Sequence, residues 1–357
     1  MDKLLDDLVV IELASVLAGP LAGSFLAELG ARVIKVENST VGGDVTRQWK
    51  HPSENNDASI SAYYASANTG KEILFLNLQL AKDYQQLVDL VVTADVIISN
   101  FQKSTAEKLK VDFTSLKKIN KDLIYAQLVA YSYDDPRPGY DLIMQAETGF
   151  ISMTGSERGE IAKMPVALID VIAGHQLKEA ILLGVITKLK TGKGSYSEVS
   201  LYKSGISALA NQASNYLMNA HVPFPIGTLH PNIAPYGDVV TTNDDIVVIL
   251  GVGSDKQFEK LGKILSLAEE LQHTFSLNKE RVGRRKELIT YLQATCKDMS
   301  YEELSAKLIN AKIPFCKSSD LDKVFEAPLA IEMIIEETIE GQKTSKVSNI
   351  AFDMIIN

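Results

Sequence analysis

The sequence predicts an α/β fold: a doubly wound, mostly parallel sheet followed by a smaller α+β domain. Two observations indicate the large domain. Short apolar runs that suit buried strands alternate with segments long enough for helices, and the first such unit has the order strand, helix, strand, which forms a parallel crossover. The smaller domain is indicated by a Pro- and Gly-containing stretch at 221–227, after which the pattern changes.

The first crossover unit follows directly from its residues. The apolar run 8–13 predicts a buried strand, and the small residues of 14–19 predict a turn. Pro20 suits the first position of the following helix, and Gly30 ends that helix. The next strand is the apolar run 32–36.

The alternation continues along the chain. In chain order we predict a strand at 73–78, a helix at 81–93, strands at 96–99 and 123–131, a helix from 170 to about 190, a strand at 196–201 and a helix ending near 218. In the second domain, 238–250 has the pattern of a hairpin that turns at 243–245. The residues 300–303 form a capping box that predicts a helix start.

Composition excludes several classes of protein. The chain has 357 residues, 46% of them hydrophobic, and a net charge of -9, which argues against general binding to nucleic acid or to an anionic membrane. The apolar stretch 8–36 is interrupted by Glu12, Glu28 and Arg32, so we expect no membrane span. The two cysteines and five histidines lack metal-ligand spacing, so we expect no metal and a reducing cytoplasm.

Cofactor signals are weak in the residues alone. The first strand, turn and helix are similar to a Rossmann-like dinucleotide site, and Glu37 stands where a ribose-binding acid would lie. However, the turn lacks G-x-G-x-x-G and keeps only Gly19 and Gly23, which suit close helix packing equally well. The stretch 251–254 has two interpretations: backbone amides that bind an anion, or a tight turn followed by a helix cap.

Asp170 is the strongest candidate for chemistry. It is a lone carboxylate in the apolar run 165–174, where an unpaired charge is costly to bury. One interpretation makes it the N-cap of the helix that follows, and the other makes it a nucleophile. The two are compatible, because a helix N-terminus also lowers the pKa of a carboxylate and keeps it ionised. No Ser or Cys has the context of an acyl-enzyme nucleophile.

The chain resembles the class III coenzyme A transferases, the family of formyl-CoA and carnitine CoA transferases, because a set of short motifs occurs in the same order. The matching segments are 9–20, 29–37, 43–47, 68–71, 94–101, 139–141, 191–194 and 230–236. The resemblance implies that Asp170 attacks an acyl-CoA thioester and then carries CoA as an aspartyl-CoA thioester. It also implies acyl-CoA and a carboxylic acid as substrates, and no preloaded cofactor.

The resemblance further implies a set of CoA contacts. By position they fall on Leu17, Ala18, Asn38, Leu76, Asn77, Leu78, Gln79, Asn100, Phe101, Gln102, Lys108, Pro138, Gly139, Tyr140 and Asp141. Relatives often carry arginine where this chain has Asn38, Thr69 and Gln102. The family fold is an interlocked homodimer, which implies a large CoA-binding domain of residues 1–220 completed by 320–357, and a small domain of residues 221–319 that begins with the linker.

Two other functions stay open on the sequence. An α-methylacyl-CoA racemase shares this fold but removes an α-proton with a His/Asp pair, and this chain has Tyr140 where that group has histidine. A CoA-binding protein that keeps the fold without turnover is suggested by the missing arginines.

Overall fold

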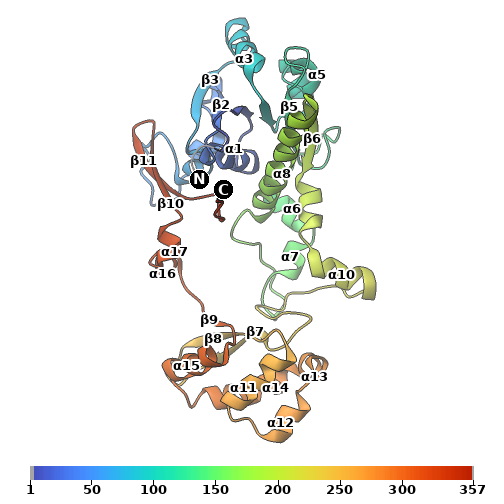
Figure 1. The fold of residues 1–357 in the computed structure, drawn as a ribbon, viewed down its shortest axis with the longest axis vertical. Coiled ribbons are helices and arrows are strands. Elements are labelled where there is room, and N and C mark those ends of the chain that lie inside the picture. Colours follow the sequence, from blue (N-terminus) through green and yellow to red (C-terminus); the bar gives the residue numbers. More distant parts are fainter. Residues whose placement is uncertain (1–3, 356–357) are drawn as a thin grey trace. The chain divides into compact units, whose positions relative to one another are not determined.

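The computed structural model describes residues 4–355, which form two compact units (Figure 1). The first contains the residues up to Ser152, Ala162–Pro223 and the residues from Leu329 onward. The second contains Met153–Ile161 and Phe224–Pro328. The predicted domains, 1–220 completed by 320–357 and 221–319, stay a prediction. Limited proteolysis tests it.

A six-stranded parallel sheet forms the centre of the first unit, with strand order β3-β2-β1-β4-β5-β6. The strands are β1 (Val9–Leu13), β2 (Arg32–Asn38), β3 (Glu72–Leu76), β4 (Val96–Ser99), β5 (Ile124–Val129) and β6 (Ser195–Ser200). Ile11 of β1 pairs with Ile34 of β2 and with Ile97 of β4. The predicted α/β class with a parallel sheet is confirmed.

Helices cover both faces of this sheet (Figure 1). On one face, α1 (Ala18–Glu28) and α8 (Leu168–Thr191) pack on Val10 and Ile98. On the other face, α3 (Ala81–Thr93), α4 (Lys103–Leu109) and α5 (Phe113–Leu116) pack on Ile11 and Ile97. Neighbouring strand residues point to opposite faces of the sheet. Continuously apolar strands such as Val96–Ser99 therefore contribute side chains to the hydrophobic cores on both faces.

Two helix predictions differ from the structure. Helix α1 begins at Ala18, so Pro20 is its third residue; proline is tolerated there because the first-turn N–H groups have no intrahelical acceptor. The helix expected to end near residue 218 is two helices, α9 (Leu201–Ser207) and α10 (Ala210–Asn219). Ala210 has a φ of 45°, which interrupts the regular helical conformation between them.

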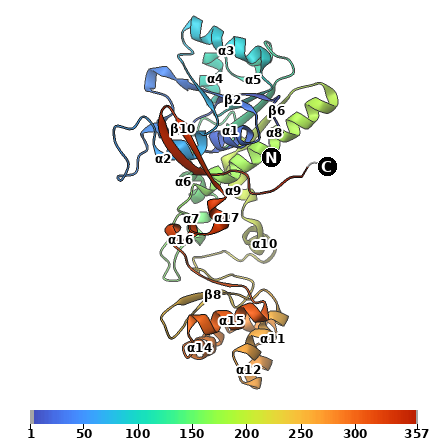
Figure 2. The ribbon, with the colours of Figure 1, turned by 60° about the vertical axis from the view of Figure 1, so that its left-hand side comes forward.

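The C-terminal hairpin belongs to the first unit. It consists of β10 (Ile334–Ile339) and β11 (Gln342–Val347) and lies beside α2 (Ala62–Asn68), far away in the sequence (Figure 2). Gly70 N–H donates to the Glu337 carboxylate at 2.8 Å. The other elements of this unit are η1 (Ser39–Val41), η2 (Val45–Gln48), α6 (Asp141–Glu147), α7 (Phe150–Met153) and α17 (Pro328–Ile331).

The second unit combines a small antiparallel sheet with helices. The predicted hairpin is present as β7 (Tyr236–Thr241) and β8 (Val247–Gly251), and β9 (Phe315–Lys317) extends its sheet. Its helices are α11 (Asp255–Ile264), α12 (Glu269–Thr274), α13 (Asn278–Gly283), α14 (Arg285–Cys296), α15 (Tyr301–Ala311) and α16 (Leu321–Val324). Ser300 caps α15 by accepting from Glu303 N–H, as the capping box predicts. Among residues 4–355, no helix combines the length and apolar character needed to cross a bilayer.

Candidate functional site

Two adjacent cavities open at the carboxyl ends of the parallel strands. The larger, of about 750 Å³, is lined by the segments that follow β1, β2, β4 and β5. The smaller, of about 230 Å³, lies against the residues that follow β2 and β3, and both share Asn38 and Phe101. The strand order reverses between β1 and β4, and ligands of open α/β sheets bind at such a point. The larger cavity has the size of a cofactor or substrate site.

Most of the residues predicted from the resemblance to contact CoA line these cavities. The larger cavity has Asn38, Asn100, Phe101, Gln102, Pro138, Gly139 and Tyr140 in its wall, and the smaller has Asn38, Leu76, Asn77, Leu78, Gln79, Phe101 and Lys108. Leu17, Ala18 and Asp141 are not in either wall: the first two are buried at the start of α1, and Asp141 is the first residue of α6.

Asp170 is not the N-cap of its helix. Ala167 occupies that position, and Asp170 is the third residue of α8, only 8% exposed. The capping is done by Asp141, whose Oδ1 accepts from the N–H groups of Ile169 at 2.8 Å and Asp170 at 3.4 Å. The other Asp141 oxygen accepts from Gln145 at 2.6 Å. The N-cap interpretation of Asp170 is therefore wrong, because a carboxylate from another helix already occupies the free amides.

The Asp170 carboxylate is left without a stabilising partner. Among residues 4–355, no donor forms a hydrogen bond to its oxygens. Burial, and then the nearby negative charge of Asp141, raise the pKa of Asp170 to about 7. The expectation that the helix N-terminus lowers this pKa is also wrong, because Asp141 brings a like charge to the same helix end. A buried carboxylate with a raised pKa is typical of functional sites.

We expect Asp170→Asn to raise the free energy of unfolding at pH 8 by up to about 4 kcal/mol. The pKa of about 7 in the folded protein lies above the ordinary value of 3.8, so ionised Asp170 destabilises the folded state above pH 7. This destabilisation disappears as the pH falls through 7 towards about 4. Urea unfolding of both proteins at pH 8 and pH 4 measures the effect; equal stability at pH 8 contradicts it.

An aromatic side chain near Asp170, Tyr63, and a second one that packs on it, Trp49, were missed by the sequence analysis. Tyr63 of α2 is half-buried, and burial followed by the negative charges of Asp170 and Asp141 raises its pKa to about 12. Its hydroxyl therefore stays protonated and can donate a hydrogen bond. Trp49 packs edge-on against the Tyr63 ring, with 5.1 Å between ring centroids. Neither residue carries a sequence signal, because only the fold brings α2 towards the start of α8.

The start of α1 packs against α8 at Gly174, one turn after Asp170. Gly174 lies four residues after Asp170 and so on the same helix face. A Cβ at Gly174 would come within 3.1 Å of the Ala18 carbonyl oxygen, so glycine permits this close approach. Helix α1 has no side-chain cap, and no acceptor among the described residues contacts the N–H groups of Leu17, Ala18 or Gly19. The start of α1, with its free donors, therefore packs against the helix that carries the candidate nucleophile.

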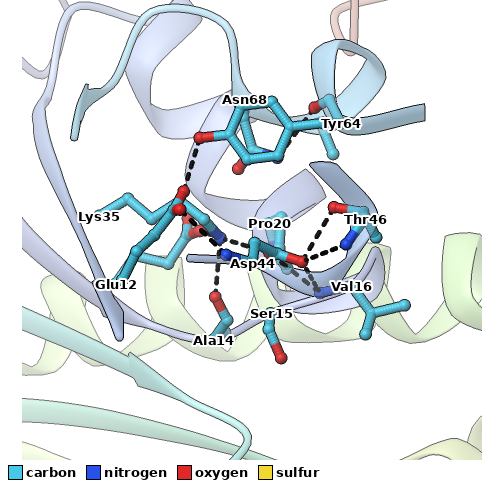
Figure 3. A network of polar contacts seen from close by, with 12 residues as sticks. Glu12, Ala14, Ser15, Val16, Pro20, Lys35, Asp44, Thr46, Tyr64 and Asn68 are labelled. Atoms are coloured by element: carbon cyan, nitrogen blue, oxygen red, sulfur yellow. Dashed lines mark hydrogen bonds and ion pairs between the residues drawn. The ribbon is translucent and has the colours of Figure 1, made fainter. Parts of the chain in front are cut away.

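A buried network of ion pairs, drawn in Figure 3, includes two residues that line the larger cavity, Lys35 and Asp44. Lys35 pairs with Glu12 at 2.9 Å and with Asp44 at 3.0 Å, and Lys71 pairs with the second oxygen of Glu12 at 2.7 Å. All four side chains are almost fully buried. Two cations and two carboxylates balance the network, as buried charges require.

Glu37 does not present a free carboxylate for a ribose. One oxygen accepts from Arg47 Nε at 2.7 Å, and the other accepts from the Tyr64 hydroxyl at 2.6 Å. Arg47 also pairs with Glu340 of the C-terminal hairpin. The dinucleotide interpretation therefore fails at Glu37, because both of its oxygens are used within the fold.

The stretch 251–254 is a turn followed by a helix cap. Gly253 N–H donates to the Gln257 side-chain oxygen at 2.9 Å, and Ser254 caps α11 by accepting from Gln257 N–H. The Gly251 and Val252 N–H groups donate to the Pro314 and Pro235 carbonyl oxygens, so three of the backbone amides considered for an anion are engaged within the protein.

Fold and site together define an α/β protein with a large cavity at the carboxyl edge of its sheet and a buried carboxylate on a helix that packs against the unbonded start of α1. The comparisons with known proteins agree with this class. The chain belongs to CoA-transferase family III, whose model matches residues 5–354, and it is a CoA-transferase. CoA-transferases use acyl-CoA as substrate.

Two curated relatives and one solved structure illustrate the similarity. A succinate–glutarate CoA-transferase of Agrobacterium fabrum is 33% identical over 98% of this chain and 88% of its own. A human succinyl-CoA:glutarate CoA-transferase is 31% identical over 97% of this chain and 78% of its own. The crystal structure of a CAIB/BAIF family protein from Brucella suis matches with a TM-score of 0.82 and 33% identity, over 99% of this chain and 93% of that one.

Proposed function

We propose that this protein moves CoA from an acyl-CoA thioester to a carboxylic acid through an aspartyl-CoA thioester on Asp170. The observation that supports the proposal is the Asp170 carboxylate itself: it is buried, has no hydrogen-bond donor among the described residues, and belongs to a helix that packs against the unbonded start of α1. Such a carboxylate is a better nucleophile than one in water, because its solvation shell is already removed.

The reaction has two matching halves. An Asp170 oxygen attacks the thioester carbonyl carbon, and the carbon–sulfur bond breaks. CoA departs as a thiolate, and the acyl group remains bound to Asp170 as a mixed anhydride. The thiolate then attacks the Asp170 carbonyl carbon and releases the donor as a carboxylate, which leaves aspartyl-CoA. The acceptor carboxylate attacks this thioester, and the same steps in reverse give the new acyl-CoA and free Asp170.

Each step passes through a tetrahedral oxyanion that needs donors. The N–H groups of Leu17, Ala18 and Gly19 are free of acceptors among the described residues, and they form the positive end of the α1 dipole. We assign them as candidate oxyanion donors, because fixed amides in a dry site stabilise charge that develops in the transition state. Gly174 supports this assignment, since it lets α1 approach α8 one turn after Asp170.

We propose that CoA occupies the two cavities at the carboxyl edge of the sheet. The predicted contacts around Asn38 and Phe101 support this, because both residues line both cavities. Tyr140 connects the larger cavity to Asp141, which contacts the start of α8. Leu17 and Ala18 then act through their backbone amides rather than through their buried side chains.

We also propose the homodimer that the resemblance implies. Large apolar side chains on α8 and α10 support it, because Leu189, Leu217 and Met218 are each about 80% exposed on the isolated chain. Sedimentation velocity measures the mass of the assembly, and a monomer at micromolar concentration contradicts the proposal.

Short dicarboxylates are the first substrates to test. Both curated relatives described above are named for succinate or its CoA thioester together with glutarate. The experiment offers succinyl-CoA with a panel of mono- and dicarboxylic acids and follows acyl-CoA products by mass spectrometry. Hydroxylamine added with the donor should modify the peptide that contains Asp170. Incorporation of solvent deuterium at the α-carbon of a branched acyl-CoA, without transfer, would instead identify a racemase.

We expect kcat/KM to fall about tenfold per pH unit below pH 7, because the protonated form of Asp170 cannot attack and the pKa of the group is about 7. Asp141→Asn keeps the oxygen that caps α8 but removes the neighbouring negative charge. This variant should shift the midpoint of the profile to lower pH. The pH dependence of kcat/KM for both proteins measures the shift, and an unchanged midpoint contradicts the role of Asp141.

A further inference from the structure

The turn between β1 and α1 has an unfavourable backbone conformation at Val16. Its φ is 73°, in the left-handed region, and Val16 is β-branched. L-residues with a branched Cβ rarely adopt this conformation, and glycine is the residue that adopts it freely. Val16 also lines the larger cavity. Such strain persists only where the surroundings impose it.

Asp44 is the side chain that holds Val16. The Val16 N–H lies between the two carboxylate oxygens of Asp44, at 3.4 and 3.2 Å. Asp44 is itself fixed, because it accepts from the N–H and the hydroxyl of Thr46 at 3.0 and 2.9 Å. Although burial opposes ionisation, the charge of Lys35 and the Thr46 donors lower the pKa of Asp44.

Lys35 holds the other side of the same turn. Its Nζ donates to the Ala14 carbonyl at 2.8 Å and pairs with Asp44 at 3.0 Å (Figure 3). The Lys35–Asp44 ion pair therefore forms hydrogen bonds to the backbone at two points, the Ala14 carbonyl oxygen and the Val16 N–H. Between them, Ser15 is held by Asn100, which accepts from Ser15 N–H at 3.2 Å and donates to Ser15 O at 2.9 Å. Side chains of other strands and loops thus fix this turn, which contains no glycine until Gly19.

We propose that Lys35 and Asp44 are positioning residues: their ion pair holds Val16 left-handed and thereby orients the Leu17 and Ala18 amides towards the acyl group on Asp170. This inference rests on the proposed function. A valine that is held by Asp44 gives one rigid arrangement of the amides, whereas a free turn would sample several. Orientation fixed before reaction contributes to the rate, because the donors then need no reorganisation as the oxyanion forms.

A purely structural network would affect stability but not the chemical step. The two roles are separated by a double-mutant cycle of Asp44→Ala and Val16→Gly. Asp44→Ala should lower kcat roughly 30-fold or more and raise KM less, since the left-handed conformation of valine then lacks its restraint. Adding Val16→Gly should recover at least about tenfold of kcat, because glycine reaches the left-handed conformation without Asp44.

Two further variants control the cycle. Asp44→Asn keeps an oxygen for Val16 N–H and should lose less kcat than Asp44→Ala, and it serves if the alanine variant does not fold. Lys312, with a φ of 56° at the end of α15, is the matched control, because Lys312→Gly relieves a left-handed residue outside the site. Lys312→Gly should not restore kcat to Asp44→Ala.

The outcomes distinguish the two proposals. If wild-type protein gives aspartyl-CoA trapped at Asp170 but Val16→Gly recovers no kcat in the Asp44→Ala background, the positioning role is overturned and the proposed function stands. Equal recovery by Lys312→Gly overturns it as well, because general stabilisation then explains the rescue. If wild-type protein gives no adduct at Asp170, the proposed function itself fails.

Discussion

Replacing Asp170 by alanine should abolish CoA transfer, with kcat reduced by at least about 10³-fold. The reason is chemical: within residues 4–355, Asp141 is the carboxylate whose charge acts on Asp170, and both Asp141 oxygens are engaged by Ile169 and Gln145. The measurement is exchange of labelled CoA into the acyl-CoA pool, together with the mass of the Asp170 peptide. Transfer at the wild-type rate contradicts the assignment.

The controls separate loss of chemistry from loss of structure. Asp170→Ala should still bind CoA, because the side chain does not line either cavity. Its unfolding by urea at pH 8 should resemble that of Asp170→Asn. Asp122→Asn is a matched substitution of an exposed carboxylate that precedes β5, at the opposite edge of the sheet from the cavities. It should transfer CoA at the wild-type rate.

Replacing Lys71 by methionine should lower the free energy of unfolding by about 3–5 kcal/mol, the usual cost of breaking a buried ion pair. Burial lowers the pKa of Lys71, and Glu12 is the largest influence that opposes this. Its Nζ contacts Glu12 and also donates to Pro20 O at 2.9 Å and Ala67 O at 2.7 Å. The variant leaves these acceptors buried and part of the Glu12 charge unpaired. Urea unfolding at pH 6 measures the loss, because the pKa of Lys71 is about 7 and its side chain is mostly charged at that pH.

A second substitution tests the cause of that loss. Glu12→Gln combined with Lys71→Met removes both charges, so the double variant should lose less stability than Lys71→Met alone. Gly23 explains why the network tolerates little rearrangement, because a Cβ there would meet the Glu12 carboxylate at 1.9 Å. A double variant that is less stable than Lys71→Met contradicts the interpretation that unpaired charge causes the loss.

Local patterns in the sequence were sufficient for much of the fold. The predicted helix 81–93 and strand 96–99 match α3 and β4 to the residue, because an apolar stripe and a short apolar run bounded by polar residues are visible within each segment. The prediction of one helix ending near residue 218 failed, because a single backbone angle divides that segment into two helices. The break between α9 and α10 depends on the φ of Ala210, for which no side chain gives a signal.

The site shows the same division more sharply. Asp170 was singled out because it is the lone carboxylate in the apolar run 165–174. The ordered motifs were enough to suggest the family. The chemical state of Asp170 was not accessible, since its pKa depends on Asp141, 29 positions away in the sequence.

The sequence by itself determined the elements of the sheet, the candidate nucleophile and the family, because these depend on residue type and local spacing. Only the tertiary structure decided that Asp141 caps α8, that Glu37 is occupied by Arg47, and that Asp44 holds Val16 left-handed. Each of these depends on a charge brought within a few ångströms by folding. Electrostatic and hydrogen-bonding energies depend on that distance and on burial, and neither the distance nor the burial can be predicted from the order of residues alone.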